Sequence, residues 1–182
     1  MKDMPLEFGI LSMTELRNRP GEILDRVADA GEAFIVERNG SRKACLVPLS
    51  VFFPDVSPAR IGEEIEELEK HGEEPRTTIT QERELAFRFP QKLADETPVS
   101  LTIVLPHGYP NICPRVYADP ITEKSPHRWK DGALCLYGVM SGWNPGKHTI
   151  FSTLMLAKRW LRHHDAWRQT GQWPKDEGVT DD

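Results

Sequence analysis

The segment VSLTIVLPHGYPNICPRVYADP, residues 99–120, decides how the second half of this chain folds. It begins with VSLTIVL, a run of apolar and β-branched residues at the length of one strand, which predicts a buried strand. The turn PHGYPNICP follows, and its prolines fix φ and remove backbone donors. RVYA then resumes a strand pattern. The segment therefore predicts two sheet strands joined by a proline-rich turn.

The flanking sequence extends this sheet and adds a helix. Upstream, TTITQERELAFRF at residues 77–89 also has strand character. Downstream, apolar residues recur at helical spacing between residues 149 and 167, in a stripe formed by Ile150, Leu154, Ala157, Trp160 and Leu161. Trp160 and Trp167 share this helical spacing, so we expect them in the core rather than on a recognition surface. The order predicts an α+β fold.

One cysteine in the segment HRWKDGALCLYGVMSGWNP, residues 127–145, has three possible roles. Cys135 lies between two leucines, and a cysteine in such surroundings is more often a buried filler. A nucleophile would have to be reachable and ionised. Asp131-Gly132, a turn signal, lies just before it.

A metal site is the third possibility, and the spacing disfavours it. The three cysteines lie far apart and show no paired spacing of the zinc type. His163 and His164 are adjacent on the expected helix, so both cannot easily face one ion. We expect no metal.

Several short motifs of the C-terminal half occur in a characteristic order over roughly residues 76–165. These elements are Val99–Pro106, Tyr109-Pro110, Pro114–Val116, His127, Gly132–Leu136, Trp143–Pro145 and Thr149-Ile150. Their order and spacing resemble the ubiquitin-conjugating enzyme (UBC) family. The resemblance implies an antiparallel meander sheet packed on helices.

The resemblance also implies a chemistry centred on Cys135. This residue would carry a ubiquitin-like protein as a thioester, received from an activating enzyme and passed to an amine of a protein substrate, or to water. No phosphate-binding loop motif occurs in the sequence, so ATP use would belong to a separate protein, and we expect no cofactor. Tyr109 and Pro110 would brace the turn, and Trp143 and Pro145 would pack beneath the cysteine loop.

The sequence departs from the family beside the cysteine. The family's His-Pro-Asn is replaced by His127, Arg128 and Trp129, so the asparagine that steadies the oxyanion is missing. Asn144 or a backbone amide could take that role. His127 could shape the loop or act as a base, and the first role is favoured. The missing asparagine also leaves open a catalytically silent domain.

The N-terminal segment has its own pattern. Ser12 followed by Glu15 forms a capping box at the start of a helical stretch, and Pro20 interrupts that stretch. Asn39-Gly40 then separates two apolar, β-branched runs as a hairpin turn does. The pattern predicts two short helices followed by a hairpin.

Over roughly residues 6–56 this order resembles the Phd/YefM antitoxin family. The resemblance implies a short first strand and a small α/β fold that forms a homodimer, binds operator DNA and uses a C-terminal tail to inhibit a toxin. Arg17 and Arg19 are the candidate DNA contacts, although these arginines could equally be an ordinary solvated surface. After residue 56 a folded domain replaces the tail, which departs from the family.

A proline-containing stretch, FPDVSPARIG at residues 53–62, divides the chain. We therefore expect a dimerisation segment at residues 1–56 and a UBC-like domain at residues 57–182. The second part opens with a helix from Pro58 to Gly72, whose glutamates form either a solvated face or an acidic docking surface.

Bulk properties restrict the functional classes. The chain has 182 residues and a net charge of −5, which gives no general basic field for nucleic acid. No apolar run is long enough for a membrane span and no signal peptide is recognised, so we expect no membrane association. Three cysteines are an odd count for a secreted disulfide framework, which favours the cytoplasm.

Two functions follow from these patterns. The first is a ubiquitin-conjugating-like cysteine transferase that carries a ubiquitin-like protein as a thioester. The single long helix and the segment WLRHHDAWRQTGQWP, residues 160–174, resemble bacterial relatives found in anti-phage operons, so we expect it in an anti-phage or modification operon. The alternative is a DNA-binding, antitoxin-like autoregulator whose UBC-like domain is silent and binds a partner.

Overall fold

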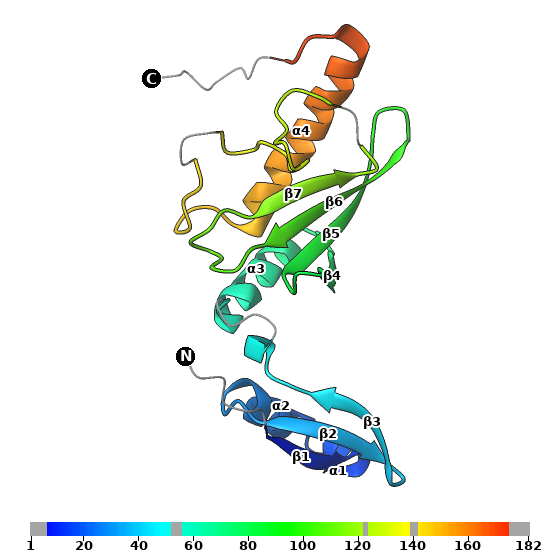
Figure 1. The fold of residues 1–182 in the computed structure, drawn as a ribbon, viewed down its shortest axis with the longest axis vertical. Helices are drawn as coiled ribbons and strands as arrows, with labels where there is room; N and C mark the ends of the chain where they lie inside the picture. Colours follow the sequence, from blue (N-terminus) through cyan, green and yellow to red (C-terminus); the bar gives the residue numbers. More distant parts are fainter. Residues whose placement is uncertain (1–6, 52–55, 122–123, 139–141, 175–182) are drawn as a thin grey trace. The chain divides into compact units, whose positions relative to one another are not determined.

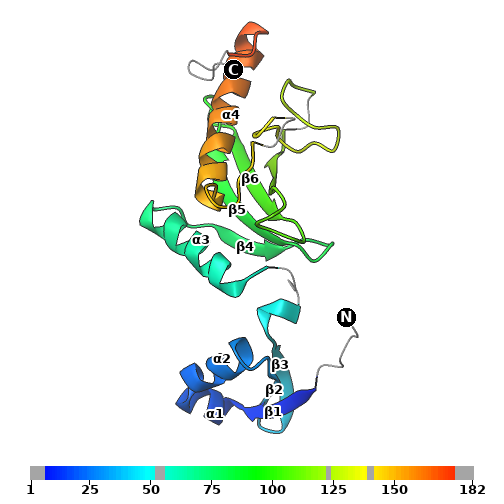
Figure 2. The ribbon, with the colours of Figure 1, turned by 90° about the vertical axis from the view of Figure 1, so that its left-hand side faces the viewer.

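The structure is a computed structural model that describes residues 7–51, 56–121, 124–138 and 142–174. The chain divides into two compact units, residues 1–54 and 55–182. Each unit has its own sheet, and each is described by itself below (Figures 1 and 2).

The N-terminal unit is a three-stranded sheet with two short helices. Its sheet has the order β1-β2-β3, with β1 parallel to β2 and β3 antiparallel to it. Its elements are β1 Phe8–Ser12, α1 Met13–Asn18, α2 Pro20–Ala28, β2 Ala33–Arg38, β3 Ser41–Leu46 and the 3₁₀ turn η1 Leu49–Val51.

Local sequence signals set the boundaries of these elements. The Ser12 hydroxyl accepts from the Glu15 N–H, and the Glu15 carboxylate accepts from the Ser12 N–H, which confirms the capping box. Pro20 begins α2, where its missing N–H costs nothing. Asn39 and Gly40 have φ values of 52° and 72°, which confirms the hairpin turn.

The core of this unit lies on one face of the sheet. Leu11, Phe34 and Val36 pack there against Ile23 and Val27 of α2. Because side chains alternate along a strand, the next residues point to the opposite face. On that face Ile10, Ile35 and Cys45 lie side by side across the three strands.

The C-terminal unit is a four-stranded antiparallel meander with the order β4-β5-β6-β7. The long helix α4 lies along one side of the sheet (Figure 2). The predicted α+β class is therefore confirmed. The elements are α3 Pro58–Lys70, β4 Arg76–Ile79, β5 Leu85–Lys92, β6 Pro98–Leu105, β7 Arg115–Asp119 and α4 Ile150–Thr170.

The strand-like segment at residues 77–89 forms parts of two strands rather than one. A tight turn separates β4 from β5, closed by the hydrogen bond from the Thr80 N–H to the Glu84 carbonyl at 2.9 Å. Arg83 has a φ of 61° in this turn. The sequence carries no glycine or proline there, so the usual turn signal is absent.

Helix α4 closes the core of this unit. Thr149 caps its first turn and Gly171, at a φ of 71°, ends it. The predicted apolar stripe is buried over its whole length, and its members are Ile150, Leu154, Ala157, Trp160 and Leu161. No helix in the described parts of the chain is long and apolar enough to cross a membrane.

Candidate active site around Cys135

Cys135 follows a tight hairpin, and the turn of this hairpin contains the Asp131-Gly132 signal seen in the sequence. The Cys135 N–H donates to the His127 carbonyl at 2.8 Å, and the Trp129 N–H donates to the Ala133 carbonyl at 2.8 Å. Gly132 closes the turn with a φ of 87° and donates to the Trp129 carbonyl. The hairpin fixes the backbone immediately before the thiol.

The Arg128 side chain stabilises this hairpin through hydrogen bonds to backbone carbonyls. Its Nε and Nη2 donate to the Gly132 carbonyl at 3.1 and 2.9 Å, and its Nη1 donates to the Ile121 carbonyl at 2.9 Å. The Leu134 N–H donates to the Val116 carbonyl of β7 at 2.8 Å. Arg128, which replaces the family's proline, therefore stabilises the hairpin, and the sequence alone did not reveal this role.

His127 acts on this loop through its backbone. Its carbonyl accepts from the Cys135 N–H and also from the Trp160 Nε1–H of α4, at 2.9 Å. Its imidazole lies against the Trp173 ring, with centroids 4.9 Å apart. These contacts accord with a loop-shaping residue, while any part in catalysis stays a prediction.

The three cysteines are free thiols in different surroundings. Cys45 is exposed, whereas Cys113 and Cys135 are half-buried. Burial raises the pKa of the Cys113 thiol to about 11. Cys135 is therefore not enclosed in the core, so the interpretation as a buried filler is not required.

The chain after Cys135 is held on α4. The hydroxyl groups of Tyr137 and Thr153 are hydrogen-bonded at 2.7 Å. The Tyr137 ring contacts Trp143 edge-on, with centroids 5.3 Å apart, and lies 5.2 Å from the His148 ring. The cysteine thus lies between two anchored points, the hairpin before it and this aromatic cluster after it.

The four predicted packing residues lie in the same neighbourhood. Trp143 donates from Nε1 to the Pro110 carbonyl at 2.7 Å, and its ring centroid lies 6.0 Å from that of Tyr109. Tyr109 is buried, and Pro145 is half-buried in the following turn. The structure therefore brings the proline-rich turn and the Trp143 segment together.

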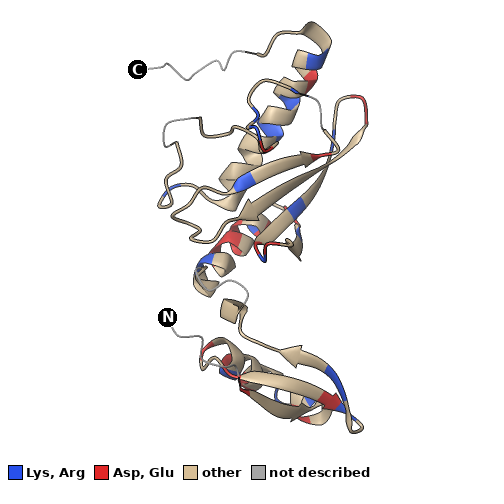
Figure 3. Cartoon of the chain, in the orientation of Figure 1, with Lys and Arg blue, Asp and Glu red and all other residues tan. Residues whose placement is uncertain are grey.

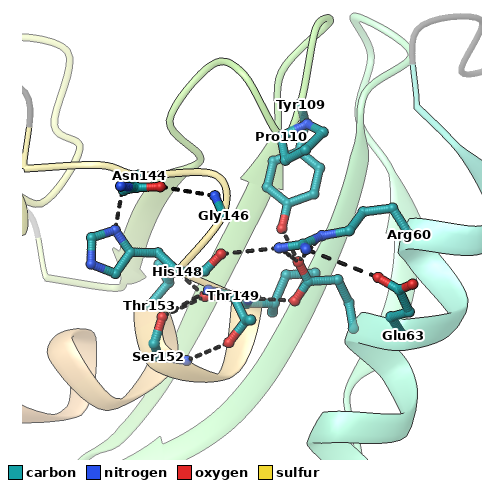
Figure 4. A network of polar contacts seen from close by, with 12 residues as sticks. Arg60, Glu63, Tyr109, Pro110, Asn144, Gly146, His148, Thr149, Ser152 and Thr153 are labelled. Atoms are coloured by element: carbon teal, nitrogen blue, oxygen red, sulfur yellow. Dashed lines mark hydrogen bonds and ion pairs between the residues drawn. The ribbon is translucent and has the colours of Figure 1, made fainter.

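Asn144 organises a turn in that segment. Its Oδ1 accepts from the Gly146 N–H at 2.9 Å, and its own N–H donates to His148 Nδ1 at 2.8 Å (Figure 4). The side-chain oxygen is therefore engaged, and an oxyanion role would fall to its Nδ2. That role stays a prediction.

A buried carboxylate that the sequence reading missed supports the whole region. Glu64 of α3 is only 1% exposed. Its oxygens accept from the Tyr109 hydroxyl, from Arg60 Nη2 at 2.7 Å and from the Ile150 N–H at 2.6 Å. Arg60 also donates to the His148 carbonyl at 3.0 Å (Figure 4).

A signal for Glu64 was present in the sequence. It lies three residues after Ile61 and four before Leu68, so it falls on the apolar stripe rather than on the solvent face. Burial, and then the neighbouring Glu64 carboxylate, raises the pKa of Tyr109 above its usual range. The phenol therefore remains a neutral donor to Glu64.

The predicted DNA-binding arginines belong to the N-terminal unit. Arg17 is exposed in the last turn of α1, and Arg19 pairs with Glu22 at 3.3 Å on the surface. In the described part of the chain, no group of three or more His, Cys, Asp or Glu side chains could hold a metal ion.

Comparison with known families gives two matches on this chain. Residues 67–180 match the sequence model of the type II CBASS E2 proteins. Residues 10–52 match that of the Phd/YefM antitoxins of type II toxin-antitoxin systems. No curated protein matches the chain.

One similar solved structure is the ubiquitin-conjugating enzyme E2 from Plasmodium falciparum. The two chains share 20% sequence identity, and the TM-score is 0.43. The match covers 57% of this chain and 96% of the other.

The first prediction concerns the buried carboxylate. Tyr109→Phe removes a donor from Glu64 and leaves a buried acceptor less satisfied, so we expect the unfolding free energy of the C-terminal unit to fall by about 1–3 kcal/mol. Tyr137→Phe is the matched control. Its Thr153 partner also donates to the Thr149 carbonyl, so we expect a loss below about 1 kcal/mol. Denaturant unfolding measures both, and equal losses would contradict the assignment.

The second prediction concerns thiol reactivity. Because the thiolate is the reactive form and the pKa of Cys113 is about 11, only about one Cys113 side chain in a thousand is ionised at pH 8. We expect iodoacetamide to modify exposed Cys45 well before Cys113. Modification of Cys113 should accelerate about tenfold per pH unit between pH 8 and 10. Peptide mapping by mass spectrometry gives the rates, and a pH-independent rate at Cys113 would refute the prediction.

Proposed function

The chain belongs to the type II CBASS E2 family, and from that membership we propose that Cys135 carries a ubiquitin-like protein as a thioester. The observation that carries the proposal is the placement of this thiol. It is half-buried rather than enclosed, and the hairpin positions it through the hydrogen bond from its N–H to His127. Membership of this family also supports a role in anti-phage defence.

The proposed reaction is an acyl exchange in two steps. The Cys135 thiolate attacks the activated carbonyl at the C-terminus of the ubiquitin-like protein. A sulfur–carbon bond forms, and the bond from that carbonyl to its previous leaving group breaks. An amine of the target then attacks the thioester, forms an amide and returns the sulfur as a thiolate. Water in place of the amine would hydrolyse the thioester.

The surrounding residues have defined parts in this proposal. His127 holds the loop through its carbonyl, and Asn144 is the candidate for stabilising the oxyanion. Tyr109 and Trp143 keep the flanking segments in place through Glu64 and Pro110.

The partners follow from the same chemistry. An activating enzyme must supply the ubiquitin-like protein in reactive form, because the sequence has no phosphate-binding loop motif. The acceptor is a protein amine.

The test is a charging reaction. Mixing the chain with an activating enzyme, ATP and a ubiquitin-like protein should give an adduct on a non-reducing gel that dithiothreitol removes. Cys135→Ser should give an adduct that resists dithiothreitol, because an oxygen ester replaces the thioester. Cys135→Ala should give none.

Cys45→Ser and Cys113→Ser are the matched controls and should charge like the parent chain. An adduct that persists in Cys135→Ala, or none with the parent chain, would refute the proposal.

The N-terminal unit supports a second function, because residues 10–52 match the antitoxin family. We propose that residues 1–56 form a dimerisation segment that binds operator DNA through Arg17 and Arg19. On the sheet face opposite α2, Ile10 is 56% exposed and lies beside Ile35 and Cys45. An apolar row open to water favours pairing with a second copy of this unit.

This function predicts salt-sensitive binding to the DNA upstream of its own gene, because phosphate contacts release counterions. The double variant Arg17→Ala with Arg19→Ala should weaken binding at least fivefold in a gel-shift titration, and Arg162→Ala in α4 is the matched control. Ile10→Lys should shift sedimentation from dimer to monomer. A chain that is monomeric and leaves this DNA unshifted at low salt would exclude this function.

A further inference from the structure

Two arginines face each other on the side of the C-terminal sheet turned away from α4. Arg76 of β4 is the direct cross-strand partner of Arg88 of β5, and the row continues through Thr102 and Tyr117. The neighbouring row, Phe87, Ile103 and Val116, is buried in the core. Since successive side chains alternate, the arginine row lies on the other face. Figure 3 shows basic residues in blue on the strands of this sheet.

The two arginines have no counter-charge within the described chain. Both are exposed, and neither side chain makes a hydrogen bond or an ion pair with a described residue. Arg115 on the same face differs, since its Nη1 lies 2.9 Å from the Asp131 carboxylate. The positive charges of Arg76 and Arg88 are therefore not neutralised by an ion pair, unlike that of Arg115.

Such a pair is unfavourable in the isolated protein. Like charges directly opposite each other on neighbouring strands destabilise a sheet. The fold itself gains nothing from Arg76 beside Arg88, and an anion placed between them would remove the repulsion.

We propose that this face binds an acidic segment of a partner polypeptide. Neighbouring strands lie about 4.8 Å apart, so both guanidinium groups can reach one carboxylate. Each guanidinium presents a planar fork that matches a carboxylate. The hydroxyls of Thr78, Thr102 and Tyr117 share the face and add polar contacts to the same segment.

The charge distribution favours a polypeptide over a nucleic acid. Nucleic-acid affinity comes from a line of cations along the phosphate backbone, and this face offers one uncompensated pair. Asp119 of β7 lies two residues after Tyr117 and therefore on the same face, and Glu84 directly precedes β5. These carboxylates would repel a continuous phosphate backbone, while a short segment with one or two acidic side chains avoids them.

Fluorescence anisotropy on the full chain tests the proposal. The probe is a fluorescein-labelled ten-residue peptide of alternating Glu and Ser, at low salt, and the matched probe has Gln in place of Glu. We expect binding of the Glu peptide only. Arg76→Gln or Arg88→Gln should weaken that binding at least fivefold, while Arg162→Gln in α4 should leave it unchanged.

A second measurement uses the repulsion between the two arginines. Without peptide at low salt, Arg88→Gln should raise the melting temperature of the C-terminal unit by about 1–3 °C. High salt should remove most of the increase, because it screens the repulsion. A substitution that merely damaged the sheet would lower the melting temperature instead.

Several outcomes would overturn the proposal. They are equal binding of the two peptides, unchanged binding in Arg76→Gln and Arg88→Gln, a lower melting temperature in Arg88→Gln, or tighter binding of a single-stranded oligonucleotide than of the Glu peptide. The Cys135→Ala chain should bind the Glu peptide like the parent. The binding assay therefore tests this proposal alone, and the charging reaction tests the thioester chemistry alone.

Discussion

The C-terminal unit depends on one buried carboxylate. Burying an ion costs several kcal/mol unless it is paired and its oxygens accept hydrogen bonds. Glu64 meets both conditions, since Arg60 supplies the charge and the Tyr109 hydroxyl and Ile150 N–H supply further donors. Its partners come from α3, from the proline-rich turn and from the first turn of α4, where a negative charge also suits the helix dipole. One side chain thereby joins three segments distant in sequence.

This network continues toward the candidate nucleophile through direct contacts. Arg60 fixes the His148 carbonyl, and the Tyr109-Pro110 turn accepts a hydrogen bond from Trp143. The rings of Trp143 and His148 both contact Tyr137, two residues after the cysteine. If Cys135 carries an acyl group as proposed, such support would keep the reacting groups aligned, because small displacements cost large factors in rate.

The sequence predicted the features that depend on residues close together in the chain, and it missed those that depend on distant residues. The capping box at Ser12, the Asn39-Gly40 turn and the apolar stripe of α4 were predictable, since each depends on residues within a few positions of one another. Glu64 lies on the apolar stripe of α3, but its burial was not recognised, because its contact with Ile150 spans 86 residues and the nearby Glu63 and Glu66 are exposed. The hydrogen bonds of Arg128 could not be predicted either, because their acceptors are backbone carbonyls that come together only in the folded hairpin.

The hairpin also narrows the choice of an oxyanion donor for the proposed chemistry. The N–H groups of Gly132, Leu134 and Cys135 donate to backbone carbonyls, and that of Ala133 donates to the Asp131 carboxylate at 3.1 Å. Recruiting any of them would break the turn that positions the thiol. For the proposed chemistry, these engaged N–H groups favour Asn144 over a backbone amide of this turn as the oxyanion donor, and that role stays a prediction. Asn144 donates to His148, whose carbonyl accepts from Arg60, so the network around Glu64 would also orient the proposed oxyanion donor.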